Sequence, residues 1–219
     1  MNKTPYKLDL HTHSIISYDG GLTEKDYTNL LKNNILDFIA ITDHNDINFA
    51  SYLQRKIGKQ IIVGEEIKTV DGEIIGLFLK EKVFPRKSVA ETIKHIHSQN
   101  GLVYIPHPFE TQRISMSYNV LIENRKNIDI IEVFNARSFG RKSTYNVKQF
   151  AEKYKIAKAT SSDAHCYAGI ASSFSVIYSI PTKENLEQVL KNGQSQEKYA
   201  VLYSYLCPFI NKIKHKLHL

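Results

Sequence analysis

Short apolar runs rich in β-branched residues recur along the chain, and segments with helical periodicity separate most of them. Such runs, bounded by turn residues, are typical of buried strands, whereas apolar residues spaced three and four apart are typical of helices that pack on one side. The alternation predicts βα units around a parallel sheet or barrel. The predicted strands are residues 8–10, 38–42, 61–67, 102–105, 130–134 and 157–161.

Two of the predicted helices begin with a capping signal. Thr23 and Ser88 each precede an acidic residue by three positions, the spacing at which a hydroxyl and a carboxylate satisfy free amides of a first helical turn. The dipeptide Asp71-Gly72 favours a tight turn between the strand-like segments on either side of it. We therefore expect a hairpin within residues 61–78 that interrupts the βα alternation.

The composition fits a single soluble domain. Of the 219 residues, 42% are hydrophobic and 23% are charged, which is enough to bury one sizeable core. No segment approaches the roughly 18 consecutive apolar residues that span a bilayer, and the polar N-terminus lacks a signal-peptide pattern. The two cysteines, Cys166 and Cys207, are too few for a disulfide framework, so a cytoplasmic location is expected.

The C-terminal residues 204–219 are first apolar and then rich in lysine. This pattern predicts a basic amphipathic helix that docks its leucine and isoleucine side chains on the domain formed by residues 1–203. Contact with a membrane surface or an anionic partner is the alternative. The net charge of +7 favours anionic partners, nucleic acid among them, although scattered lysines also fit a solvated basic surface.

Histidines mark the ends of the predicted strands. Five of the nine histidines follow an apolar run within a few residues, where a parallel α/β fold places its functional loops. These five are His11, His13, His44, His107 and His165. Surface roles are expected for the other four, which are His95 and His97 in the helix after Ser88, and His215 and His218 in the basic tail.

Acidic residues accompany these histidines. In an extended chain His11 and His13 point to the same side, so both imidazoles can bind one cation; two satisfied polar residues at a strand end are the alternative. Carboxylates beside imidazoles suit Mn, Fe or Zn in a multinuclear site, and the scarcity of cysteine argues against a structural thiolate zinc site. The accompanying segments are Asp19-Gly20, Asp43-His44, Glu65-Glu66, His107-Pro108, Asn135 and Asp163-Ala164-His165.

The ordered series HxH, TDH, GxE, HP and SDAH over residues 7–170 resembles the polymerase and histidinol phosphatase (PHP) superfamily. The resemblance implies a distorted seven-stranded (β/α)7 TIM-like barrel and two or three divalent metal ions. It implies three ligand groups: His11, His13, Glu66 and Asp163 for one metal, Glu66 and His107 for a second, and Asp19, His44 and His165 for a third. Asp19 stands where some members have histidine. Asn135 stands near the place of a further ligand to the second metal, where a neutral amide binds more weakly.

The neighbours of these residues have supporting roles in the prediction. Asp9 and Asp43 are expected to orient nearby histidines, since metal-bound imidazoles need an acceptor for their second nitrogen. Glu65 should point to the opposite face of its strand from Glu66, as a solvated or supporting carboxylate. Cys166 is expected to be a small packing residue.

The predicted chemistry is hydrolysis of phosphate esters, because clustered divalent metals supply hydroxide at neutral pH and neutralise charge on phosphoryl oxygens. A hydroxide bridging the metals would attack, and His44 or His165 would act as a ligand or handle protons. Arg137 is the best candidate to clamp phosphate oxygens. Arg113, Arg141 and Lys142 are weaker candidates, because loop charges are commonly solvated.

The expected substrate is a small phosphorylated metabolite or nucleotide. The alternatives are histidinol phosphate or phosphotyrosine hydrolysis, 3′–5′ exonuclease action on DNA or RNA, and a non-catalytic metal-binding or interaction module. Residues 15–18 and 114–118 are expected to line the substrate pocket.

Overall fold

The sheet forms the centre of the molecule. The computed structural model describes residues 4–138 and 141–217, and in that part nine strands form one sheet in the order β7-β6-β5-β4-β3-β2-β1-β8-β9. The strands are β1 (Tyr6–Asp9), β2 (Phe38–Ile41), β3 (Ile61–Lys68), β4 (Glu73–Leu77), β5 (Leu102–Ile105), β6 (Ile130–Asn135), β7 (Ala157–Ser161), β8 (Phe174–Ile177) and β9 (Gln194–Gln196).

The strand directions agree with the predicted βα units. Strands β1, β2 and β3 are parallel to one another, and so are β5, β6 and β7. Strand β4 is antiparallel to both β3 and β5, so the predicted hairpin is confirmed. Its turn needs a glycine at Gly72, because φ there is +132° and a Cβ would lie 2.9 Å from the backbone of Met116.

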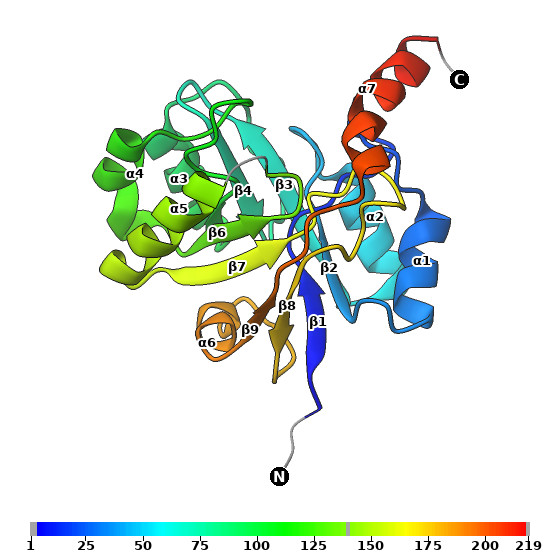
Figure 1. Cartoon of the computed structure of the whole chain (residues 1–219), viewed down its shortest axis with the longest axis horizontal. Coiled ribbons are helices and arrows are strands. Elements are labelled where there is room, and N and C mark those ends of the chain that lie inside the picture. The colour runs from blue at the N-terminus through cyan, green and yellow to red at the C-terminus, as the bar shows by residue number, and fades with distance from the viewer. Residues whose placement is uncertain (1–3, 139–140, 218–219) are drawn as a thin grey trace.

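The sheet curves until its edges nearly meet (Figure 1). Beyond the ends of β1 and β7, Thr12 and Ala164 form an isolated parallel bridge, and the His13 amide donates to the Ala164 carbonyl at 2.9 Å. The expected α/β class and barrel-like sheet are confirmed. The strand count differs from the expected seven-stranded form, because β4 is an antiparallel insertion and β8 and β9 extend the β1 edge.

Most of the helices cover the outside of the curved sheet (Figure 1). Both predicted capping boxes are present: Thr23 accepts from the Asp26 amide and Ser88 from the Glu91 amide, and both acidic side chains bond back to the caps. The helices are α1 (Glu24–Lys32), α2 (Asn48–Ile57), α3 (Val89–Ser98), α4 (Tyr118–Asn124), the 3-10 turn η1 (Arg125–Asn127), α5 (Arg141–Tyr154), α6 (Leu186–Lys191) and α7 (Leu202–Leu217). None of the described helices has the length and apolar character needed to cross a membrane.

Alternate strand residues belong to two apolar clusters. In β2, Ile39 and Ile41 pack in the cluster that includes helix residues such as Leu53, whereas Phe38 and Ala40 belong to a second cluster with residues such as Leu8 of β1. Because both faces of the strands are buried, polar side chains collect at the strand ends.

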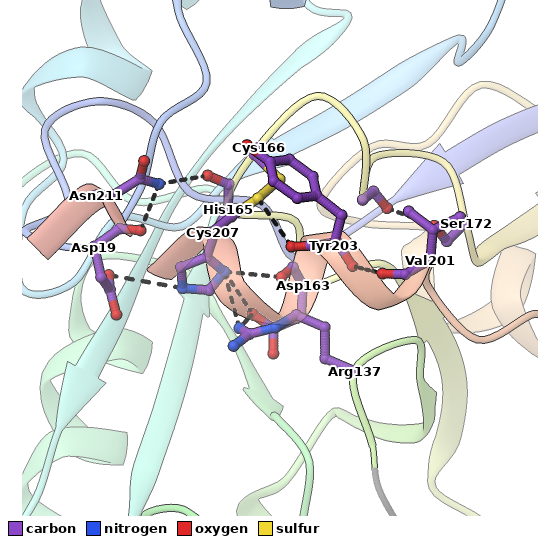
Figure 2. The surroundings of a disulfide bond; sticks show 12 residues. Asp19, Arg137, Asp163, His165, Cys166, Ser172, Val201, Tyr203, Cys207 and Asn211 are labelled. Carbon is purple, nitrogen blue, oxygen red and sulfur yellow. Dashed lines mark hydrogen bonds and ion pairs between the residues drawn. A yellow bond between two sulfur atoms is a disulfide. The ribbon is translucent and has the colours of Figure 1, made fainter. Parts of the chain in front are cut away.

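Helix α7 is attached to the body by polar and covalent contacts (Figure 2). Cys207 forms a disulfide with Cys166, and Asn211 Nδ2 donates to the carbonyls of Asp19 and His165 at 2.9 Å each. The prediction that Cys166 is only a packing residue is therefore wrong, and the cysteine content no longer supports a reducing compartment.

The prediction that α7 docks its leucines and isoleucines is also wrong. The residues of α7 that the body buries are Ser204, Cys207 and Pro208. The leucines, Phe209 and Ile213 lie on the opposite side of the helix and are exposed, and Ile210 is partly buried. A helical hydrophobic pattern fixes a stripe on the helix but not the partner that covers it.

Candidate metal centre and active site

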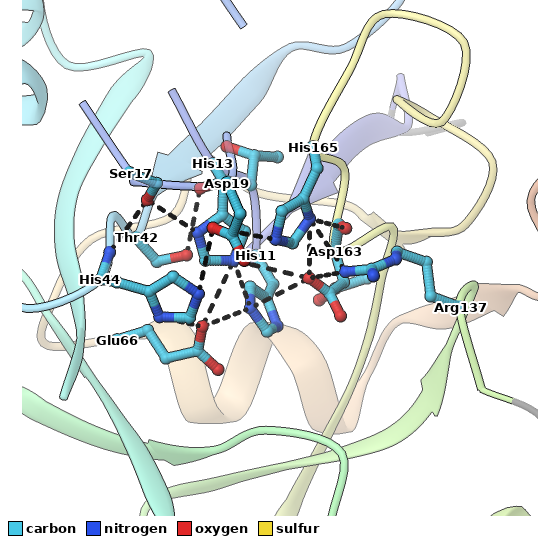
Figure 3. A network of polar contacts seen from close by, with 12 residues as sticks. His11, His13, Ser17, Asp19, Thr42, His44, Glu66, Arg137, Asp163 and His165 are labelled. Carbon is cyan, nitrogen blue, oxygen red and sulfur yellow. Dashed lines mark hydrogen bonds and ion pairs between the residues drawn. The ribbon is translucent and has the colours of Figure 1, made fainter. Parts of the chain in front are cut away.

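The predicted metal ligands meet at the carboxyl ends of the strands (Figure 3). All of them are buried except His44, which is partly exposed. The set consists of His11 and His13 after β1, Asp19 in the next loop, His44 after β2, Glu66 in β3, His107 after β5, and Asp163 and His165 after β7.

The first group has the spacing of atoms around one cation. His11 Nε2 and His13 Nε2 lie 3.1 Å apart, and Glu66 Oε2 lies 3.4 Å from the former and 3.3 Å from the latter. Asp163 Oδ1 lies 3.5 Å from each imidazole nitrogen. Four ligands at about 2.1 Å around a tetrahedral ion are about 3.4 Å from one another. The four residues fit a shared cation.

Glu66 also faces the other two groups. Its Oε1 lies 3.0 Å from His107 Nε2, and its Oε2 lies 3.2 Å from His44 Nδ1. Asp19 Oδ1 lies 3.5 Å from His44 Nε2 and 3.6 Å from His165 Nε2, and it has no hydrogen-bond partner among the described residues. The arrangement gives Glu66 the position of a bridging carboxylate and leaves a buried oxygen of Asp19 open for an ion.

Burial and nearby charges shift the pKa values of the clustered side chains. Burial alone would raise the pKa of Asp163, but His11, Arg137 and Arg113 hold it well below its usual value. Burial, reinforced by Arg137, lowers the pKa of His165 to about 3. His165 is therefore a neutral imidazole at pH 7, which is the form that binds metals.

Glu132 of β6 is a buried carboxylate that the sequence analysis missed. It accepts from His11 Nδ1 at 3.2 Å, from the Tyr104 hydroxyl at 2.8 Å and from the His107 amide at 2.6 Å. Asn135 donates to Glu132 at 2.9 Å and to Asp163 at 3.2 Å, so its amide nitrogen holds carboxylates in place. A single acidic residue within an apolar strand run was the signal for Glu132.

Asp43 reaches the histidines through a serine. Ser17 Oγ donates to Asp43 at 2.9 Å, and it lies 3.2 Å from His13 Nδ1 and 3.0 Å from the His44 amide. Asp9 differs from the expectation, because it accepts from the backbone amides of His11 and Ser162 instead of from an imidazole.

Glu65 points away from the cluster, as the strand alternation predicts, but it is fully buried instead of solvated. It accepts from the Val83 amide at 2.8 Å, and burial raises its pKa to about 7. The cause is the loop that covers this side of β3, which the strand pattern does not reveal.

An open cleft of about 290 Å³ leads to the cluster. Arg113 and Arg137 line it, and both contact Asp163 through Nη1. Arg113 Nη2 and Arg137 Nε have no hydrogen-bond partner among the described residues. Both of these nitrogens are buried, but the arginine side chains are 23% and 18% exposed, so an anionic group in the cleft can contact the two guanidinium groups.

Several cleft residues were expected and others were not. Tyr18 and Ile114 come from the two loops that were predicted to line the pocket. Tyr18 stacks on His44 with ring centroids 5.0 Å apart, and Lys212 of α7 lies 5.0 Å above the Tyr18 ring. Glu73 was missed, and burial, with Glu66 nearby, raises its pKa to about 8.

The remaining candidates lie elsewhere. Lys142 lines a separate cavity beside Phe109, so it is not placed with the metal ligands. The side chain of Arg141 and the whole of His218 lie outside the described residues. His95 and His97 lie within ion-pair distance of Glu81 and Asp129 at the surface, and His215 is exposed.

Comparison with known sequences finds two archaeal relatives, and no family model matches. The chain is 38% identical to the uncharacterized protein MJ0417 of Methanocaldococcus jannaschii over 167 residues, which are 73% of this chain and 65% of that protein. It is 33% identical to the uncharacterized protein MJ1587 of the same organism over 143 residues, 59% of this chain and 82% of that protein. The chain thus spans a little under two thirds of the length of the first relative.

Solved structures share the fold at low identity. A two-domain protein of Bacteroides vulgatus that contains a predicted PHP-like metal-dependent phosphoesterase matches with a TM-score of 0.71 and 16% identity, over 96% of this chain and 70% of that one. The lesion-specific endonuclease EndoQ of Pyrococcus furiosus matches with a TM-score of 0.64 and 13% identity, over 88% and 57%.

Fold and site together define an α/β barrel-like protein with a histidine and carboxylate cluster at its carboxyl edge. The chain belongs to one sequence family with MJ1587. Its fold is that of solved structures that contain a PHP-like metal-dependent phosphoesterase, the kind of protein that its motif series resembles.

Proposed function

We propose that the chain hydrolyses phosphate esters with two or three divalent ions, Mn, Fe or Zn, held by the buried cluster. His11, His13, Glu66 and Asp163 would hold the first, Glu66 and His107 the second, and Asp19, His44 and His165 the third. When bound, such ions activate water and neutralise charge that develops on phosphoryl oxygens.

The observation that carries the proposal is the pair of arginines beside the donor cluster. Arg113 and Arg137 line the cleft with partly exposed side chains, and both contact Asp163. Guanidinium groups bind non-bridging phosphate oxygens strongly, and charge-assisted donors fixed in advance stabilise a phosphoryl transition state. A metal-storage or structural site has no need of two such donors.

The residues around the cleft support a compact substrate. The cleft is small, and Tyr18, Ile114 and Pro208 supply apolar wall while Lys212 adds a cation near Asp19. A small phosphorylated metabolite or mononucleotide fits this lining. The His44 side chain is 12% exposed against 3% for His165, so it is the ligand of the third ion that a substrate in the cleft can reach more easily.

Action on a nucleic acid is the second candidate. The net charge of +7 favours it, and EndoQ is a lesion-specific endonuclease with the same fold. Binding to an extended phosphate backbone should weaken steeply with salt, whereas binding of one small ester should weaken only slightly.

The test is elemental analysis followed by a phosphoester panel with Mn²⁺. The panel runs from p-nitrophenyl phosphate and its bis ester to mononucleotides, histidinol phosphate, a phosphotyrosine peptide and oligonucleotides. We expect two or three metals per chain with turnover. A metal-free protein that is inert on every ester would favour the non-catalytic module.

A matched pair of variants tests the bridging assignment. Glu66→Gln should lose metal and turnover, whereas Glu65→Gln, on the other face of the same strand, should keep both because its amide oxygen still accepts from Val83. Asp163→Ala should lose hydrolysis and keep the fold. Full activity of Glu66→Gln would refute the assignment.

A further inference from the structure

The outer face of α7 is an apolar stripe. Its members are between 42% and 83% exposed, and they are Leu202, Leu206, Phe209, Ile213 and Leu217. Single exposed apolar residues are common, but a contiguous group of this size marks an interaction site.

The stripe is turned outward by the way α7 is attached. Its members are spaced by four, three, four and four residues, which places them on one side of a helix. The opposite side carries Cys207 and Asn211, which attach the helix to the loop of His165 and Cys166 and to the loop of Asp19. Helix α7 projects from the body toward the C-terminus (Figure 1), so the stripe faces away from the barrel.

The charges beside the stripe select the kind of partner. Lys212, Lys214 and Lys216 belong to the same helix, which contains no acidic residue. Two copies packed stripe against stripe would bring like charges together. A partner surface with an apolar interior and negative charge at its boundary would match both the apolar stripe and the lysines.

We propose that α7 lies on the surface of an anionic lipid bilayer, with its apolar stripe among the acyl chains and its lysines at the headgroups. A helix with Leu and Phe on one face and lysines beside it binds membranes in this way without spanning them. Anionic lipids attract each nearby lysine. Since Pro208 and Lys212 also line the cleft, the bound helix holds the candidate active site near the lipid surface.

Tryptophan reporters test the proposal on the whole chain, which contains no tryptophan of its own. Phe209→Trp places a reporter in the stripe. Phe84→Trp is the matched control, because Phe84 is as exposed as Phe209, 65% against 67%, but lies in the segment between β4 and α3. We expect a blue shift of the emission with phosphatidylserine–phosphatidylcholine vesicles for Phe209→Trp only. No shift, or equal shifts in both variants, would overturn the proposal.

Vesicle sedimentation measures the two contributions separately. Lys214→Gln with Lys216→Gln should lower partitioning to the anionic vesicles roughly 30-fold, since each lysine near the surface contributes roughly fivefold. Pure phosphatidylcholine vesicles should bind the unmodified protein much more weakly, and Phe209→Glu should abolish sedimentation while Phe84→Glu does not. If the lipid-free protein is a dimer that Phe209→Glu dissociates, the stripe is a contact between copies and the membrane proposal is wrong.

Discussion

Replacing Cys207 with serine should lower the free energy of unfolding of the oxidised protein by about 4 kcal/mol. The bond joins residues 41 positions apart, and the enclosed segment contains β8, α6 and β9. A crosslink removes conformations from the unfolded chain in proportion to the logarithm of the loop length. For a loop of this size the entropy is about 13 cal/mol/K, which is about 4 kcal/mol at 25 °C.

The substitution itself should add little to this loss. Cys207 is buried, and its sulfur lies 3.6 Å from the Tyr203 carbonyl, so a serine hydroxyl can donate to the same oxygen. Removing the bond by Cys166→Ser should therefore lower stability by a similar amount, because both variants open the same loop.

Urea denaturation with and without dithiothreitol measures the effect. Reductant should shift the midpoint of the wild type to that of Cys207→Ser and should not change the variant. Thiol titration of the unfolded, unreduced wild type should find no free thiol. Two free thiols, or a wild-type midpoint that dithiothreitol leaves unchanged, would refute the reasoning.

Four further predictions concern the metal centre. Chelation should lower the melting temperature by about 5–10 °C, since a ligand at 100 times its Kd stabilises by about 2.7 kcal/mol; a melt in EDTA that matches the metal-loaded melt would contradict this. Ser17→Ala should weaken metal retention by about 10-fold or more in a competition with a chromophoric chelator, because Ser17 connects Asp43 to His13 and His44. Arg137→Ala should lower kcat by about 100-fold or more with an unchanged metal content, and metal loss in this variant would show a structural role instead. Metal affinity should also fall as pH drops below about 9, because imidazole ligands must be deprotonated and, against the effect of burial, Asp163 and Glu66 raise the pKa of His13 to about 9; an affinity measured by calorimetry that does not change between pH 9 and pH 6 would contradict this.

Much of the site could be predicted because it follows strand ends. Chain order alone places His11, His44, His107 and Asp163 after successive apolar runs and Glu66 near the end of another, and parallel strands bring their carboxyl ends to one edge. The hairpin at Gly72 and the two capping boxes were also predicted, since each depends on a few neighbouring residues.

Contacts between distant segments could not be predicted from the sequence. Glu132 meets His11 across 121 positions, next to an irregularity in the register of β6 and β7. The disulfide likewise depends on where α7 crosses the loop after His165. Neither local propensity nor periodicity contains this information.

The bridge between Thr12 and Ala164, which helps to close the sheet, has a thermodynamic consequence. Asp9 and Ser162, which meet there, are 153 positions apart, and the predicted ligands of one ion come from both sides of this junction. Such an ion would link the two sides of the sheet reversibly. Its measured affinity would then include the free energy of closing the sheet. Hydrogen-exchange protection of β1 and β7 would then rise and fall with metal content, even though the predicted ligands follow these strands and do not belong to them.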